Sequence, residues 1–233
     1  MNSLDYDITQ RPDFAMVAVR LQAEQQVFAE PSAMASMDPN IHMKAGFKGG
    51  FKASLGRAFG GESMIVNTFT AQNKPGEVVF AAGTLGDAVH YSLSGNTLYL
   101  QRGAYMAHSG GVEVSGKWQG AKGFFSGEGL VLLKASGAGD VFFTSYGAIL
   151  EIDVAEEGYI VDSGYIVAFE DTLSYHIRTV PGMSTGGKIK SFLFGGEGLV
   201  CEFSGQGKVW IQTRAAGPYL NWTYPFRPTK NNN

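Results

Sequence analysis

The sequence is poor in the residues that would supply covalent or metal chemistry. Cys201 is the only cysteine in 233 residues, so the chain can form neither an internal disulfide nor a cysteine-cluster metal site. The histidines are scattered and lack the clustered spacing of zinc ligands: His42, His90, His108 and His176. We therefore predict no catalytic site, no metal and no cofactor, and we expect Cys201 to be a small residue of a strand.

Long apolar runs and a surplus of positive charge are also missing. No segment approaches the roughly 18 apolar residues that a membrane-spanning helix needs. The N-terminus carries early acidic residues and has no apolar run typical of a secretory signal. The net charge of −3 disfavours nucleic acid as a partner. These absences, with the single thiol, predict a soluble, cytoplasmic protein in a reducing compartment.

One glycine loop comes close to a nucleotide-binding motif. Residues 182–188, "GMSTGGK", match the phosphate-loop spacing, but Ile189 stands where a Ser or Thr hydroxyl would reach the metal ion. We therefore predict no nucleotide site there.

Glycine is abundant, and it points to the fold. The chain has 32 glycines, about twice the number that an average usage of about 7% gives, while 44% of its residues are hydrophobic. Glycine reaches positive φ at little cost, so many glycines between short apolar runs indicate turns between strands. The sequence predicts an all-β protein.

A short motif occurs three times, with its glutamates 66 and 69 residues apart. Each copy has an aromatic residue three positions before the glutamate and a glycine one position before it. The nine residues are Phe59, Gly61, Glu62, Phe125, Gly127, Glu128, Phe194, Gly196 and Glu197. Repetition favours a structural role, in which the glutamate holds a turn at the start of a strand. The alternative is that the three glutamates line a ring or contact a partner.

Further blocks repeat around this motif in the same order. Apolar runs follow each glutamate, and glycine-bearing turns follow the second and third runs at 136–140 ("SGAGD") and 204–208 ("SGQGK"), which predicts β-hairpins. An upstream block aligns Met34, Tyr105 and Tyr165. We predict three tandem units at 4–84, 85–158 and 159–222, followed by a polar tail at 223–233.

Residues 44–61 show the best helical pattern in the chain. Phe47, Phe51 and Leu55 recur every four residues, beside Lys48 and Lys52. The interspersed glycines favour a short helix or loop near 47–59. A basic amphipathic segment could also contact a membrane or a partner protein.

Several linked stretches resemble one family. They are "RPDFAM", "DPNI", "GGES", "KWQG", "FSGEGL", "SYGAI", "GEGLVCEF" and "KVWIQTR". Over about residues 5–217 the chain resembles uncharacterised bacterial and archaeal relatives of the mitochondrial-biogenesis family (altered inheritance of mitochondria, twenty-four). The resemblance implies three units, each a short β-sandwich or double-stranded β-helix similar to the trp RNA-binding attenuation protein. It also implies a homotrimer that forms a pseudo-ninefold ring.

The resemblance implies a role in organisation, because the family has no assigned reaction and its mitochondrial members are associated with inner-membrane organisation. We predict a non-enzymatic structural or binding protein of the scaffold type whose main partner is itself. One alternative is a membrane- or envelope-associated organising protein. A further alternative is an RNA-binding ring, which the acidic net charge disfavours.

Overall fold

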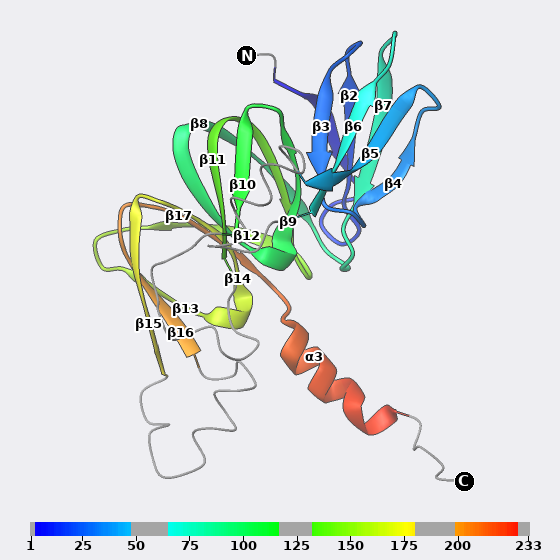
Figure 1. The fold of residues 1–233 in the computed structure, drawn as a ribbon. Coiled ribbons are helices and arrows are strands. Elements are labelled where there is room, and N and C mark those ends of the chain that lie inside the picture. The colour runs from blue at the N-terminus through cyan, green and yellow to red at the C-terminus, as the bar shows by residue number, and fades with distance from the viewer. Residues whose placement is uncertain (1–2, 48–64, 117–131, 180–198, 228–233) are drawn as a thin grey trace.

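The structure is a computed structural model that describes residues 3–47, 65–116, 132–179 and 199–227. The regular structure of these residues is mostly β-strand, with a short helix near the C-terminus (Figure 1). The all-β prediction is confirmed. The nine residues of the repeated motif, together with Lys48, Phe51, Lys52 and Leu55, lie outside the described residues.

The first part of the chain forms a four-stranded antiparallel sheet and one end of a ten-stranded sheet. Its strands are β1 (Asp5–Thr9), β2 (Met16–Leu21), β3 (Gln26–Ala29), β4 (Met34–Met37), β5 (Ile41–Phe47), β6 (Ile65–Ala71) and β7 (Gly76–Ala81). Strand β7 pairs with β2 and β4, and β6 pairs with β3 and β5. In β2, alternate side chains from Val17 to Leu21 are buried because a strand directs successive side chains to opposite faces.

The middle part uses two long strands in place of several short ones. Its elements are β8 (Ala88–Gln101), the 3₁₀ turn η1 (Arg102–Ala104), β9 (Tyr105–Ser109), β10 (Val112–Ser115) and β11 (Leu132–Thr144). Strand β11 pairs with β8 along its whole length, with β9 near its end and with β10 near its start.

The last part returns to short strands. Its elements are β12 (Ile149–Val154), β13 (Tyr159–Asp162), η2 (Ser163–Tyr165), β14 (Ile166–Glu170), β15 (Leu173–Thr179), β16 (Leu199–Gly205), β17 (Gly207–Gln212), the helix α3 (Ala216–Thr223) and η3 (Tyr224–Phe226). Strand β17 pairs with β12 and β14, and β16 pairs with β13 and β15.

The predicted hairpins are wrong. Residues 136–140 lie inside the continuous strand β11, and β16 and β17 pair with other strands, not with each other. Gly137 has φ +108° and Gly205 has φ +103°. Gly205 lies where the chain leaves the sheet of β16 and enters that of β17, whereas Gly137 lies at a register irregularity within β11.

Two further sequence interpretations need correction. The residues from Lys44 to Phe47 do not begin a helix, because they pair with Thr68 to Ile65 as part of β5. Ile166, and not Tyr165, occupies the position of Met34 and Tyr105. Each of these three residues precedes a register shift in its pairing with β7, β11 or β17.

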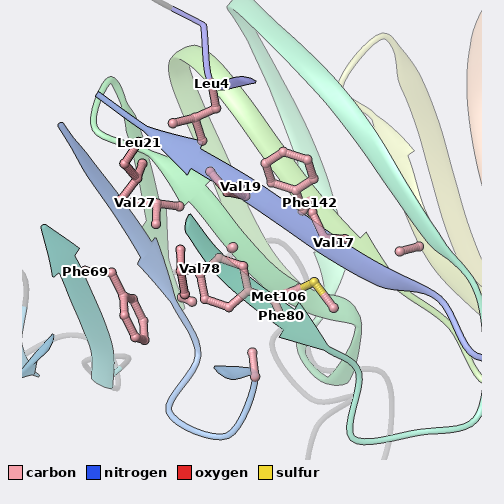
Figure 2. Packing of buried hydrophobic residues seen from close by; sticks show 14 of the residues in the cluster. Leu4, Val17, Val19, Leu21, Val27, Phe69, Val78, Phe80, Met106 and Phe142 are labelled. Atoms are coloured by element: carbon pink, nitrogen blue, oxygen red, sulfur yellow. The ribbon is translucent and has the colours of Figure 1, made fainter. Parts of the chain in front are cut away.

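The core consists of three apolar clusters, and each contains residues from more than one part of the chain. Figure 2 shows the first cluster, in which Phe142 and Met106 from β11 and β9 lie with Val17 and Phe80. In the second cluster Trp210 of β17 packs against Phe143, with ring centroids 5.7 Å apart. The successive parts of the chain are therefore joined by shared cores.

Candidate functional site

Two strand pairings join the three parts of the chain and define two internal joints. At the first joint, β3 pairs with β9, and Phe28 lies opposite His108. At the second joint, β8 pairs with β14, and Tyr99 lies opposite Phe169. At the first joint, β3 precedes the turn at residues 31–32, and its partner β9 follows η1. At the second joint, β8 precedes η1, and its partner β14 follows η2.

Each joint is closed by a pair of stacked rings. The Phe28 and His108 rings lie 5.3 Å apart at an interplanar angle of 13°, and the Tyr99 and Phe169 rings lie 5.2 Å apart at 29°. Both His108 and Phe169 are buried. Stacked rings across a sheet stabilise a strand pair beyond the area they bury.

Buried polar groups support the first joint. The Tyr105 hydroxyl lies 2.6 Å from Nδ1 of His108 and donates to the Phe28 carbonyl at 3.4 Å. Burial, and then the charge of Glu30, raises the pKa of Tyr105 well above its usual value, so this phenol stays neutral.

A second polar group supports the other joint. The Tyr91 hydroxyl donates to Glu170 at 2.8 Å, and Glu170 also accepts from the backbone N–H of Lys208 at 2.9 Å. Burial and the Glu170 carboxylate raise the pKa of Tyr91 to about 12. The ionisable groups at both joints thus have structural hydrogen-bond partners.

Two of the described strands pair on one side only, although their counterparts in the other parts of the chain pair on both sides. Strands β9 and β14 pair on both sides, whereas β4 pairs only with β7 among the described strands. Likewise β3 and the second half of β8 pair on both sides, whereas β13 pairs only with β16 in the described part of the chain. Strands β1, β5, β12 and β15 also lie at sheet edges. We call β4 and β13 the two open edges because their counterparts in the other parts of the chain are paired on both sides.

The residues on the open edges correspond to the stacked rings at the joints. Met37 on β4 lies three residues after Met34, where the register shifts. His108 and Phe169 lie three residues after the corresponding shifts at Tyr105 and Ile166. Ile160 on β13 occupies the position of Phe28 and Tyr99. Met37 is 39% exposed and Ile160 is 52% exposed, although their counterparts at the joints pack on a neighbouring strand. Exposed aliphatic side chains on an unpaired strand favour pairing with another chain.

Cys201 lies where the sequence predicts it. It is a fully buried residue of β16, and burial raises the pKa of its thiol to about 12. The thiol is therefore protonated at neutral pH, and a protonated, buried thiol is a poor nucleophile.

The histidines do not converge on one site. His90 contacts Asp140 at 2.8 Å, and the other oxygen of Asp140 accepts from the backbone N–H of Leu4 at 2.8 Å. His42 and His176 are exposed on separate strands. Across residues 3–47, 65–116, 132–179 and 199–227, no group of three or more His, Cys, Asp or Glu side chains could hold a metal ion.

None of the helices in the described part of the chain combines the length and apolar character that a membrane crossing requires.

Sequence reasoning missed the open edges. The signal was present in "YIVD", where Tyr159, Ile160 and Val161 are apolar at three consecutive positions. A strand with one face toward solvent alternates apolar and polar residues, whereas a strand with both faces covered does not.

The fold and its edges define a class of protein: an all-β chain whose described strands form antiparallel sheets of four, ten and three strands, with β4 and β13 each at the edge of a smaller sheet. The comparison with family models goes further. Residues 6–214 match the family described as Mitochondrial biogenesis AIM24, and the chain belongs to that family.

Two streptococcal proteins are similar over almost the whole chain. An uncharacterised protein of Streptococcus pyogenes serotype M6 is 24% identical over 99% of this chain and 94% of its own length. A crystal structure of a Streptococcus pyogenes protein from a structural genomics programme is 23% identical, with a TM-score of 0.77 over 96% of this chain and 100% of that chain. The second similarity shows that the two chains share a fold.

Proposed function

We propose that this protein is a non-enzymatic structural or binding protein, built from three tandem units, that closes head to tail into a ring of three copies. The observation that carries the proposal is the pair of complementary open edges, β4 and β13. The ring would present a repeated surface to a partner, as a scaffold does, and its units would resemble those of the trp RNA-binding attenuation protein.

Strand pairing supports the three units. Counting from β2 in the first part and from β12 in the last, one late strand pairs with the first and third strands, and another pairs with the second and fourth. In the middle part, β8 and β11 each carry two of these strands without interruption. A register shift falls at the same point of all three units, next to Met34, Tyr105 and Ile166.

The internal joints provide a template for the contact between copies. Applied to the open edges, it pairs β13 of one copy with β4 of the next, with Val161 opposite Ser36 and Ile160 opposite Met37. This pairing buries the exposed aliphatic side chains and satisfies the edge backbone groups that water otherwise solvates. Ring closure leaves no such edge unpaired, because each copy has one edge of each kind.

The chemistry of the described side chains favours a binding role over a catalytic one. The Cys201 thiol is buried and protonated, and the carboxylates of Asp140 and Glu170 are committed to backbone and side-chain partners. The unpaired thiol fits a reducing, cytoplasmic compartment. Membrane or envelope association through residues 44–61 and RNA binding remain predictions from the sequence.

Light scattering of the purified protein tests the ring. We expect a mass of three times the 25.0 kDa chain, and Ile160→Lys should lower it to one chain, because a lysine on an edge strand opposes pairing. Leu150→Lys is the matched control, since Leu150 is 47% exposed on β12 and lies at neither joint. A wild-type mass of one chain would refute the ring.

A further inference from the structure

The C-terminal helix carries a concentration of exposed apolar side chains. Tyr219, Leu220 and Trp222 of α3 are 48%, 52% and 65% exposed, and Tyr224 and Phe226 of η3 are 65% and 74% exposed. None of the residues of either element is buried. An isolated helix of eight residues is marginal in water, so α3 needs a surface to pack on.

The helix carries no charged side chain. Residues 216–226 contain no Asp, Glu, Lys or Arg, and apart from the tyrosine hydroxyls their polar side chains are those of Asn221 and Thr223. A helix on a membrane surface usually has a strongly charged, mostly basic, polar face, and α3 has none. The composition therefore favours a protein partner over a lipid surface.

The place of α3 in the fold indicates which protein surface it meets. Ala215, just before α3, is buried near Gly164, so the helix begins beside η2, which directly follows the open edge β13. In Figure 1 the strands follow a bend, and α3 projects on its inner side. A chain that continued the series of units past β13 would have to lie beside this helix.

A band of stacked linkers runs through the chain at the base of α3. Ala15 donates from its backbone N–H to the Gly86 carbonyl at 2.9 Å, and Asp87 donates to the Gly147 carbonyl at 3.1 Å. These linkers immediately precede β2, β8 and β12. We call the segments 14–15, 85–87 and 146–148 the linker band. The Tyr219 ring of α3 already contacts Tyr146 of this band, with centroids 5.8 Å apart.

When the pairing of the two internal joints is applied between copies, the linker band continues into the next copy. Phe14, Gly86 and Gly147 hold equivalent positions two residues before β2, β8 and β12. In the single chain the N–H of Ala148 donates to Oγ1 of Thr213 at 2.9 Å. In the repeated hydrogen bond it would donate instead to the Phe14 carbonyl of the next copy, which would place Phe14 at the base of α3. Phe14 is 65% exposed in the single chain.

We propose that α3 and η3 of one copy pack on the linker band of the next copy, around its Phe14, so that the C-terminal segment straps neighbouring copies together on the inner side of the ring. This inference rests on the proposed ring. It adds a second contact to the β13–β4 pairing, and it places apolar side chains from the C-terminus along the inner wall.

Fluorescence of Trp222 tests the strap without disturbing the fold. Subtracting the signal of Trp222→Phe from that of the wild-type protein isolates Trp222 from Trp118 and Trp210. We expect acrylamide to quench Trp222 in the assembled protein at least threefold less than in a synthetic peptide of residues 214–227. Phe14→Ala should restore much of that quenching while the mass by light scattering stays that of three chains.

Cross-linking identifies the surface on which the strap packs. In a Cys201→Ala background, a short bis-maleimide linker should join Phe14→Cys and Trp222→Cys between different chains. Met43→Cys is the matched control, because Met43 is 40% exposed on β5 of the same unit but lies outside the linker band. We expect no interchain product between Met43→Cys and Trp222→Cys.

The outcomes separate the strap from the ring. A trimer in which Trp222 is quenched as in the peptide, or in which the control pair links equally well, would overturn the strap alone. A mass of one chain would overturn both proposals. Protection of Trp222 that appears only with anionic phospholipid vesicles would replace the strap with a membrane contact.

Discussion

Gly137 shows how one residue can determine where a strand changes its neighbour. Its φ of +108° is strained for any residue with a side chain, and an added Cβ would lie 2.4 Å from the carbonyl oxygen of Gly111. The glycine sits at the register irregularity of β11, between the part that pairs with β10 and the part that pairs with β9. A left-handed residue at this point lets one strand pair with β10 over its first half and with β9 over its second half.

We predict that Gly137→Ala lowers the free energy of unfolding by about 1–3 kcal/mol, because the alanine must adopt a left-handed conformation and displace a backbone carbonyl. Urea denaturation followed by far-UV circular dichroism measures the change. Gly83→Ala is the control: an added Cβ there meets no atom within 4 Å, and its cost should stay within about 0.5 kcal/mol. Equal costs at the two positions would contradict this account of Gly137.

At the scale of elements, β4 and β13 are strands whose sequence suits a partner they lack within the chain. Their counterparts at the internal joints are covered on both sides and carry stacked rings. Met37 and Ile160 hold the same positions on strands that no described strand covers on that side. The register of the proposed contact follows from the two joints, and it can be tested one pair at a time.

We predict that opposite charges at the paired positions restore an assembly that a single charge breaks. Ile160→Lys alone should dissociate the ring, and adding Met37→Glu should recover part of the trimer, because the two side chains would lie directly opposite each other in the new sheet. Sedimentation velocity at low salt measures the recovered fraction. Ser36→Glu is the control for register, since Ser36 would lie opposite Val161. Better rescue by Ser36→Glu than by Met37→Glu would show that the register is wrong.

At the scale of the whole molecule, shared cores make the chain one cooperative body. Phe142 belongs to β11, yet it packs in the first cluster, where its ring lies 5.0 Å from that of Tyr6. Trp210 belongs to β17, yet it packs in the second cluster. Repeats that bury apolar surface against their neighbours depend on those neighbours for stability.

We predict that Phe142→Ala lowers the free energy of unfolding by about 3–5 kcal/mol, because it opens a cavity in a fully buried cluster. We expect a single transition, in which tryptophan fluorescence and far-UV circular dichroism change together, since damage to the first core also weakens the joints. Leu150→Ala, at an exposed site, should leave the midpoint nearly unchanged. If Phe142→Ala separated the two signals into distinct transitions, the parts of the chain would be independent.

The sequence by itself determined the strand content, the repeated blocks, the family and the place of Cys201. These features depend on composition, on alternation along a strand and on self-similarity, all of which are local. Val17 to Leu21 of β2 alternate as a half-buried strand must, and Cys201 follows an apolar pair into a buried strand.

Only the tertiary structure decided which strands pair, where the sheets remain open and that the C-terminus continues into α3. Glycine turns at 136–140 and 204–208 look alike in a hairpin and in a strand that changes sheet, because both need positive φ. Exposure of Ile160 depends on a neighbour that is distant in sequence or belongs to another copy. Partners of that kind leave no local pattern, so the pairing, and the interface it predicts, required the fold.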